Sequence, residues 1–497
     1  MRILTLLLLF LTNPLFASFH MNERMQQSYI HIINLEFEAA NKLLQIEQKE
    51  YPDNAILILH QNYIDFLTVL IGEEEEFFST AKALKSARID LIRDGDDSSP
   101  YYLFAQAEVH LQWAFARIKF EEYLTAAYEI QKAYSLLEKN QEQFPDFKLN
   151  IKGLGLLHTL VGAIPEKYQW VTNLVGMEGS VELGLSELKS LLKDEEMEMY
   201  HSEIIFLTAF LQLNMTNDEI AYKQLLDDIG SKYSDNYLLN FAAARLSHAL
   251  GVNDLCVKVL ENRPTIQGKF SFHYLDYLLG MSYLYKLEYE KSKVYFTLFL
   301  SNFKGNNYIK SAYHKLAWIS FLQGEDNNYF ELVKAKGIAS IDEDKVALKE
   351  ANSSIKNKYH THSRLLRTRL LRTRLLYDGG YYDEALLEIS SVKILKKYSG
   401  FYDEYWYRLA RIKSKLNYNY VVVITSYQKS YDLGIVDNQS TNYYAPMSAL
   451  QIGLIYEKRN DNKKAAIYFE RCLSLSNFDY ERGIHQKAKI GLVRLAN

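Results

Sequence analysis

One spacing of large and small residues near the C-terminal end of this 497-residue chain restricts its fold more than any other feature. In a unit of about 34 residues counted from Pro446, positions 7, 8, 11, 20, 24 and 27 are held by Ile452, Gly453, Tyr456, Ala465, Phe469 and Cys472. Small residues at positions 8 and 20 let two helices approach closely, and large residues fill the space beside them. The spacing therefore predicts a hairpin of two helices that packs against similar hairpins.

Parts of the same spacing recur upstream. The matching positions in units counted from His273, Leu366 and Asp403 include Leu279, Gly280, Tyr283, Phe296, Gly380, Tyr382, Ala385, Ile389, Trp406, Leu409 and Ala410. This pattern resembles that of tetratricopeptide repeat (TPR) proteins. The resemblance implies an all-α fold, a TPR-like α-solenoid of about ten helix-turn-helix hairpins that form a right-handed superhelix with a concave groove.

Composition agrees with a helical chain. Only 7 prolines and 22 glycines are present, which favours long helices over a turn-rich β protein. The one β-like run, YVVVITSY at 420–427, lies in the register of a helical hairpin, and we expect it to be a helix rich in β-branched residues. Ser99 and Pro100 have the residue types of a helix N-cap and first turn, and Gly230 that of a helix end.

A glycine-rich segment, 153–184, interrupts the repeat pattern. It resembles the family that contains tetratricopeptide repeat protein 39 and the yeast inclusion-body clearance protein, on the residues Gly155, Leu156, Pro165, Leu174, Gly176, Gly179 and Gly184. The resemblance implies a repeat scaffold without enzymatic activity. A phosphate-binding loop is the weaker alternative, because no strand precedes Gly153 and no Gly-Lys-Ser/Thr ending follows. Close helix packing and a turn explain the glycines better.

The N-terminal sequence MRILTLLLLFLTNPLFASFH predicts a signal peptide, because a positive residue and an apolar run precede a cleavage site after Ala17. An uncleaved anchor is the alternative, but the run is short for a membrane span. We expect the protein to be exported, and periplasmic or secreted, with no transmembrane segment in the mature chain. The expected divisions are a signal peptide at 1–17, degenerate helical repeats at 18–200, middle repeats at 201–345, a basic loop at 346–365 and C-terminal TPR repeats at 366–497.

Neither catalysis nor metal or cofactor binding is predicted. His360 and His362 lie two residues apart without a nearby third ligand, so we interpret them as part of a solvated loop. The acids of EEEE at 73–76 suit the start of a helix. DGDDSSP at 94–100 lacks the distal glutamate of a calcium loop. Cys256 and Cys472 lie in apolar helical patterns and are predicted to be buried free thiols.

The sequence RLLRTRLLRTRLL at 364–376 contains the unit RLLRT twice, and residues 351–377 carry a charge of +7 with no acid, in a chain of net charge −4. Each five-residue step turns about 140° around a helix, so the leucines cannot all share one face. The register set by Ala385 places Arg369 and Arg372 at packed positions. One extra residue in the following turn would instead place Leu371 and Leu375 inward and leave Arg372 as the only misfit.

Two interpretations of this run stay open. It is either a basic surface that binds an acidic peptide tail or an anionic envelope polymer, or a duplication tolerated on a solvated helix. Arginine pairs with carboxylates and phosphates through two hydrogen bonds. The candidate partner-binding residues are therefore Arg367, Arg369, Arg372, Arg374 and Tyr377. Nucleic acid is not an expected partner of an exported protein, and a membrane-surface helix would need a cleaner apolar face.

The functional hypothesis is an exported, non-enzymatic scaffold or adaptor that binds a protein or peptide through its groove. The alternative is a sensor or regulatory module that acts with a separate membrane or output protein, because no output domain follows the last repeat before LVRLAN. An enzyme would require a site assembled from distant residues, which no catalytic motif indicates. The sequence identifies neither the partner nor the oligomeric state.

Overall fold

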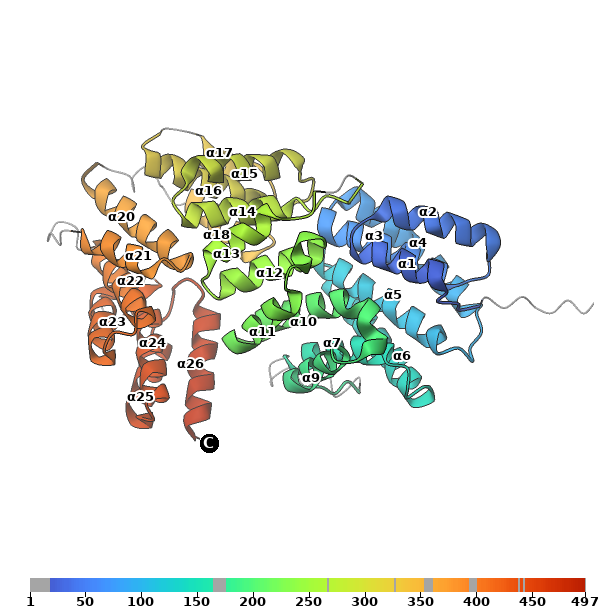
Figure 1. Cartoon of the computed structure of the whole chain (residues 1–497). Helices are drawn as coiled ribbons and strands as arrows, with labels where there is room; N and C mark the ends of the chain where they lie inside the picture. The colour runs from blue at the N-terminus through green and yellow to red at the C-terminus, as the bar shows by residue number, and fades with distance from the viewer. Residues whose placement is uncertain are drawn as a thin grey trace, which may run out of the picture. The chain divides into compact units, whose positions relative to one another are not determined.

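A computed structural model describes residues 18–163, 176–265, 268–325, 328–352, 361–392, 400–436, 439–440 and 443–496. The predicted signal peptide at 1–17, Pro165, Leu174, His360 and the side chain of His362 lie outside the described residues. The all-α prediction is confirmed, because consecutive helices build the described chain (Figure 1). The strands there are a two-residue pair, β1 (Ile435–Val436) and β2 (Gln439–Ser440), which lie antiparallel.

The chain divides into two compact units. Unit 1 comprises Met1–Leu279, Val294–Ala312 and Ala335–Ala347, and unit 2 comprises Gly280–Lys293, Tyr313–Lys334 and Leu348–Asn497. The division passes through five helices: α14 (Tyr274–Tyr285), α15 (Tyr289–Asn302), α16 (Ile309–Gln323), α17 (Tyr329–Ala335) and α18 (Asp342–Asn352). Of the borders predicted from repeat quality, the one near 345 lies close to the division between Ala347 and Leu348, whereas those near 200 and 366 fall inside unit 1 and unit 2.

Unit 1 begins with helices that pack in consecutive pairs around a shared apolar core, in which Trp113, Ile56 and Leu137 are fully enclosed. Ser99 caps α5 and Pro100 begins it, as predicted. The helices are α1 (Glu23–Ile33), α2 (Phe37–Glu50), α3 (Ile56–Gly72), α4 (Glu75–Arg93), α5 (Pro100–Lys119), α6 (Tyr123–Gln143), α7 (Leu149–Gly162), α9 (Val181–Leu191), α10 (His201–Met215), α11 (Glu219–Ile229), α12 (Tyr237–Ala249) and α13 (Asn253–Glu261), with short 3₁₀ turns at Glu195–Tyr200 and Lys232–Ser234.

The glycine-rich segment joins α7 to α9 by close backbone contact, which confirms the packing interpretation. An added Cβ on Gly184 would lie 2.6 Å from the backbone nitrogen of Thr159, and one on Gly155 would lie 3.0 Å from the carbonyl oxygen of Gly184. Gly176 has a φ of +71°, which glycine adopts without strain. These glycines therefore shape a helix crossing and a turn.

Unit 1 also encloses a set of charged side chains. The ammonium group of Lys152 on α7 is only 3 % exposed, and it donates to Glu203 at 2.9 Å and to the hydroxyl of Tyr63 at 2.9 Å. It lies 3.3 Å from Glu108, whose carboxylate also accepts the Tyr63 hydroxyl at 2.6 Å. Burial raises the pKa of Glu108, although the charge of Lys152 opposes that shift.

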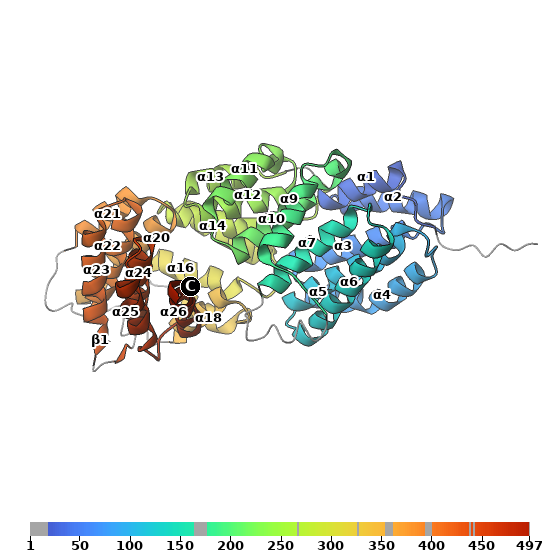
Figure 2. The same ribbon diagram turned by 90° about the horizontal axis from the view of Figure 1, so that it is seen from below.

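Unit 2 contains the helices with the clearest repeat spacing, and α22 to α25 lie side by side in it (Figure 2). Ile452, Ala465, Phe469 and Cys472 are fully buried, and a Cβ on Gly453 would approach the ring of Phe469 to 2.6 Å. The hairpin predicted from Pro446 is confirmed, and glycine is needed at position 8. The helices are α20 (Thr361–Asp378), α21 (Tyr382–Ser390), α22 (Tyr402–Lys415), α23 (Tyr420–Gly434), α24 (Tyr444–Lys458), α25 (Asn462–Leu473) and α26 (Glu481–Ala496).

Other predictions have mixed outcomes. Residues 420–427 are helical, Gly230 ends α11 with a φ of +52°, and Cys256 and Cys472 are buried free thiols, all as expected. The predicted basic loop at 346–365 is wrong at both ends, because residues 346–352 belong to α18 and residues 361–365 to α20. Within EEEE, Glu75 and Glu76 start α4 as expected. Glu73 instead ends α3 in a left-handed conformation.

Candidate functional site

The arginine run forms most of α20, and neither predicted register describes how this helix packs. Leu366, Leu370 and Thr373 face the interior, followed by Leu375 and Leu376. Leu375 is buried as the second register required, but Leu371 is only partly buried. Arg369 and Arg372 lie beside the buried stripe with side chains 37 % and 38 % exposed. Thr373 is turned inward, and both arginine side chains keep partial exposure, although Nε of Arg372 is itself buried.

Arg369 and Arg372 share one carboxylate. Glu388 on α21 accepts a hydrogen bond from Nη1 of Arg369 at 3.1 Å, and Nε of Arg372 lies 3.2 Å from the same oxygen, Oε1. The Glu388 side chain is 9 % exposed, so it is held firmly between them. Two positive charges therefore meet one negative charge.

A second pair of arginines shares another carboxylate. Arg374 on α20 and Arg411 on α22 lie 3.6 Å and 3.9 Å from the two oxygens of Asp378. Both distances exceed hydrogen-bond length, so the attraction is ionic. Asp378 does not form the paired N–H···O hydrogen bonds that a close arginine–carboxylate contact has. Their side chains are 41 % and 30 % exposed.

Aromatic rings support these guanidinium groups. Arg374 lies over the ring of Trp318 on α16, with 5.0 Å to the ring centre, and the ammonium group of Lys315 lies 3.9 Å from the centre of the same ring. Arg411 lies 4.0 Å from the ring centre of Tyr377. Such stacking orients a cation while its edge stays in water. We call the set Lys315, Trp318, Arg374, Tyr377, Asp378 and Arg411 the arginine–aromatic face.

The surroundings keep Arg411 charged. Burial lowers the pKa of Arg411, but Tyr407, Tyr377 and Asp378 raise it, and the net shift is upward. Tyr407 is buried beneath this face, and its hydroxyl lies 3.3 Å from that of Tyr443, the residue before α24. The first helices of successive hairpins thus present tyrosines next to fixed positive charges.

The remaining predicted residue, Arg367, stands apart from this face, over the ring of Phe401 at 4.5 Å. The structure therefore brings together Arg374 and Tyr377, places Arg369 and Arg372 on Glu388, and separates Arg367 from both groups. Sequence reasoning missed Trp318, Lys315 and Arg411. Arg411 could have been found, because it follows Tyr377 by 34 residues, and equal positions in neighbouring repeats lie side by side.

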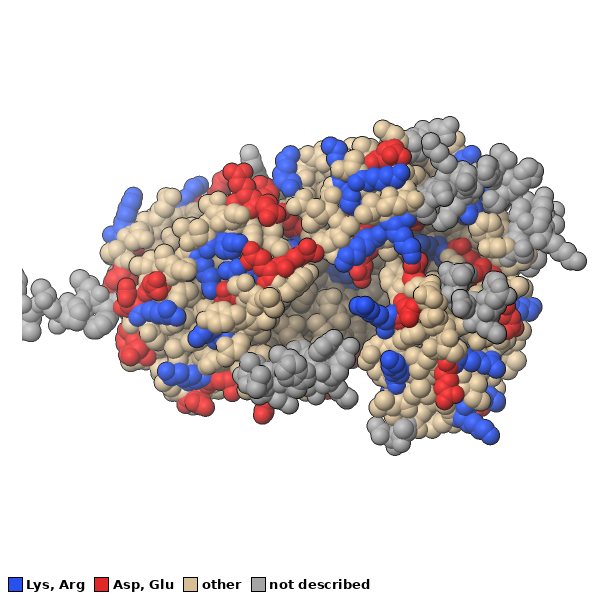
Figure 3. Space-filling view, turned by 180° about the vertical axis from the view of Figure 1, so that it is seen from behind, with Lys and Arg blue, Asp and Glu red and all other residues tan. Residues whose placement is uncertain are grey.

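No charge field of one sign dominates the surface seen in Figure 3, where basic and acidic side chains are interspersed over the described residues. In the same described part of the chain, no three His, Cys, Asp or Glu side chains come together as metal ligands would. None of the described helices combines the length and apolar character of a membrane span. The arginine–aromatic face places cations beside aromatic rings, an arrangement that suits binding of an anion.

Comparison with known proteins gives one family match. The model of the family described as Iml2/Tetratricopeptide repeat protein 39 matches residues 102–365, which is more than half of the chain. No curated protein matches.

Similar solved structures include the following two. The crystal structure of the APC/C hetero-tetramer Cut9–Hcn1 is similar with 12 % identity and a TM-score of 0.25, over 95 % of this chain and 94 % of that chain. The crystal structure of yeast Tom70 is similar with 11 % identity and a TM-score of 0.24, over 95 % of this chain and 96 % of that chain.

Proposed function

Because the chain belongs to the Iml2/Tetratricopeptide repeat protein 39 family, we propose that it is a non-enzymatic scaffold or adaptor. Its partner is a protein with an acidic segment, which binds at the arginine–aromatic face. A TPR-like scaffold is suited to protein–protein interaction in general. The acidic character of the partner rests on one observation in unit 2: two arginine pairs each share a single carboxylate.

The charge balance of these pairs favours an anion. Arg369 and Arg372 with Glu388 carry a net charge of +1, and Arg374 and Arg411 with Asp378 carry another. A carboxylate of a partner would complete either set, since each guanidinium group can donate to two oxygens. Asp378 is too distant to saturate the N–H groups of Arg374 and Arg411.

The rings hold the guanidinium groups in place and add little contact area of their own, because Trp318 is only 5 % exposed and Tyr377 is partly buried. Trp318 and Tyr377 are already fixed by the cations stacked on them, so binding orders few additional side chains. The face therefore has the two components of a binding site, an anchor for charge and a rigid support beneath it.

Export remains part of the proposal. The apolar N-terminal run and the small residues after it support removal of residues 1–17, which would place the partner in the periplasm or outside the cell. N-terminal sequencing of the protein purified from its natural source tests this step. A mature chain that begins at Ser18 is expected, and a chain that retains residues 1–17 would contradict it.

The binding proposal is tested with a charge-removal variant and a matched control. R367Q/R369Q/R372Q/R374Q removes four positive charges from α20. K463Q/R482Q/K487Q/K489Q removes the same charge from exposed positions of α25 and α26 in the same unit. Circular dichroism first confirms that both variants are folded.

Crosslinking in envelope extracts then compares the captured proteins, and a glutamate-rich synthetic peptide tests direct binding. We expect the α20 variant to lose the crosslinked partner and to bind the acidic peptide at least about tenfold more weakly. The control should retain both. Equal binding by the two variants would reject the arginines of α20, including Arg374 of the arginine–aromatic face, as the binding site.

A further inference from the structure

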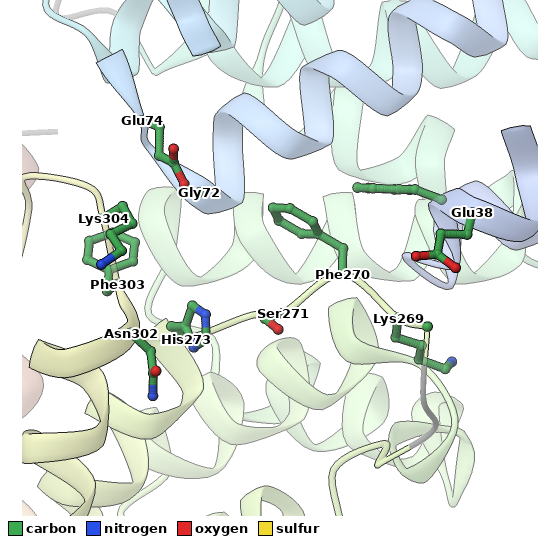
Figure 4. A pocket seen from close by; sticks show the side chains of 12 residues that line it. Glu38, Gly72, Glu74, Lys269, Phe270, Ser271, His273, Asn302, Phe303 and Lys304 are labelled. Carbon is green, nitrogen blue, oxygen red and sulfur yellow. The ribbon is translucent and has the colours of Figure 1, made fainter. Parts of the chain in front are cut away.

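Unit 1 contains a separate cavity of about 510 Å³, a volume in the usual range for ligand pockets. It lies where the start of α2, the end of α3, the segment 268–273 and the end of α15 meet (Figure 4). Its apolar surface comes from Phe37, Phe270 and Phe303. Its charged groups include Glu38, Glu74 and Lys304.

The position of Phe270 is fixed by backbone and ring contacts. Its N–H donates to the carbonyl oxygen of Leu35 at 2.7 Å, which ties the segment to the turn before α2. Its ring centre lies 5.2 Å from that of Phe37. A Cβ on Gly72 would lie 3.6 Å from the ring of Phe270, so the end of α3 approaches the ring without filling the cavity. The aromatic surface is therefore formed before any ligand binds.

The two glutamates of the cavity form no ion pair among the described residues, whereas the glutamates near them in the chain do. Glu36 pairs with Lys269 at 3.0 Å, and Glu73 pairs with Lys119 at 2.5 Å. Glu38 and Glu74 are exposed, and no described residue forms an ion pair or a side-chain hydrogen bond with either carboxylate. Figure 4 shows them at opposite ends of the cavity with Phe270 between them.

The basic groups of the cavity do not cancel these charges. The ammonium group of Lys269 is held outside by Glu36 and by the carbonyl oxygen of Asp235, at 2.7 Å. Burial lowers the pKa of His273, and its imidazole is neutral near pH 7. Lys304 is the remaining cation and lies at the Glu74 end of the cavity, away from Glu38 (Figure 4), so the cavity carries a net charge of −1 among its described groups.

We propose that this cavity binds the cationic side chain of a lysine or arginine in a peptide segment of a partner. The aliphatic stem would lie on Phe270 and Phe37, and the charged end would reach Glu38 or Glu74. Ring faces attract cations, and a carboxylate beside them without another partner adds an ionic attraction. This site is independent of the acidic segment proposed for unit 2, because it has the opposite charge preference.

The test measures binding of small probes to the full chain by ligand-observed NMR. The probes are N-acetyl-arginine amide, neutral N-acetyl-norleucine amide and N-acetyl-glutamate amide. The arginine probe is expected to bind with a dissociation constant on the order of 1 mM, as suits a ligand of this size. The two other probes should bind at least about fivefold more weakly.

Variants locate the site. E38Q and E74Q should each weaken binding of the arginine probe about fivefold, and F270A should abolish detectable binding. Glu74 makes no side-chain capping bond to α4, so E74Q removes no structural hydrogen bond. E75Q, on the next residue and outside the cavity, is the matched control and should leave binding unchanged.

Three outcomes overturn the proposal: no binding of the arginine probe, equal binding by E38Q, E74Q and E75Q, or preference for the glutamate probe. Preference for the glutamate probe would mean that the cavity binds an anion through Lys304. Because R367Q/R369Q/R372Q/R374Q leaves unit 1 unchanged, it should bind the arginine probe normally. Failure of the unit 2 proposal is thereby distinguished from failure of this one.

Discussion

Unit 1 encloses a set of charged groups around Lys152, whereas the arginine pairs on α20 and α22 of unit 2 lie partly open to solvent. Lys152 is 3 % exposed and bonded to Glu203 and Tyr63, but Arg374 is 41 % exposed and lies 3.6 Å from Asp378. Enclosed charges must keep their partners, because an unpaired buried charge is costly. Exposed charges stabilise the fold little and can exchange partners. The same residue types therefore maintain structure in unit 1 and are available for binding in unit 2.

Two glycines give the largest expected contrast. A Cβ on Gly184 in unit 1 would collide with the backbone of α7, but one on Gly483 in unit 2 would meet nothing within 4 Å. G184A should lower the free energy of unfolding by at least about 3 kcal/mol or prevent folding. G483A, near the start of α26, should change it by no more than about 1 kcal/mol, in the stabilising direction. Urea unfolding and hydrogen exchange in α7 and α26 measure both, and similar effects of the two substitutions would contradict the contrast.

Removing one buried charge should be the next largest effect. K152M leaves Glu108 and Glu203 facing each other without their cation, and should cost about 3–5 kcal/mol of unfolding free energy. R374M, the matched change in unit 2, should cost less than about 1 kcal/mol. The triple variant K152M/E108Q/E203Q removes the uncompensated charges and should recover part of the loss. If K152M is as mild as R374M, the ionic set of unit 1 is not structural.

The pH dependence of unit 1 supplies a third test. Burial lowers the pKa of His60 from 6.5 to about 3, and its ring is 1 % exposed with Ser28 as its hydrogen-bond partner. A base with a lowered folded-state pKa contributes stability above its unfolded pKa and loses it as the pH falls toward the folded value. Between pH 6.5 and about 3, the wild type should therefore lose up to about 1.4 kcal/mol per pH unit relative to H60Q. Urea unfolding across this window measures the difference, and parallel curves for both proteins would exclude the effect.

The sequence predicts those parts of the fold in which one residue type determines the contact. Gly453 and Phe469 are such a pair, because the ring occupies the place that a side chain at 453 would take. The face of α20 could not be predicted in this way. Its five-residue repeat matches no helical face, so the burial of Thr373 is decided by packing against the rest of unit 2.

Site residues were predictable only where they share a repeat position or a run. The arginine run identified Arg374, and a comparison of equal positions would have added Arg411. Lys152 gave no signal, because its partners Glu108 and Glu203 are 44 and 51 residues away along the chain. Contacts between residues at different repeat positions cannot be found by comparing repeats, because they are determined by how the helices pack in three dimensions.

The smallest effect tests the charge excess on which the function proposed for unit 2 depends. Arg369 and Arg372 contact the same oxygen of Glu388, so removal of either one leaves an ordinary one-to-one ion pair. R369Q and R372Q should each change the free energy of unfolding by less than about 0.5 kcal/mol. The double variant leaves the mostly buried carboxylate of Glu388 unpaired and should cost about 1–2 kcal/mol, more than the sum of the single changes.

Affinity for an acidic peptide, unlike stability, should already fall when one arginine is removed. One lost arginine already cancels the excess charge beside Glu388, so each single variant should weaken binding of an acidic peptide although stability is kept. Isothermal titration at low and high salt separates the two quantities, because screening acts on the exposed arginines far more than on the fold. If the single variants lose stability and keep affinity, both arginines are structural partners of Glu388, and unit 2 uses its charges as unit 1 does.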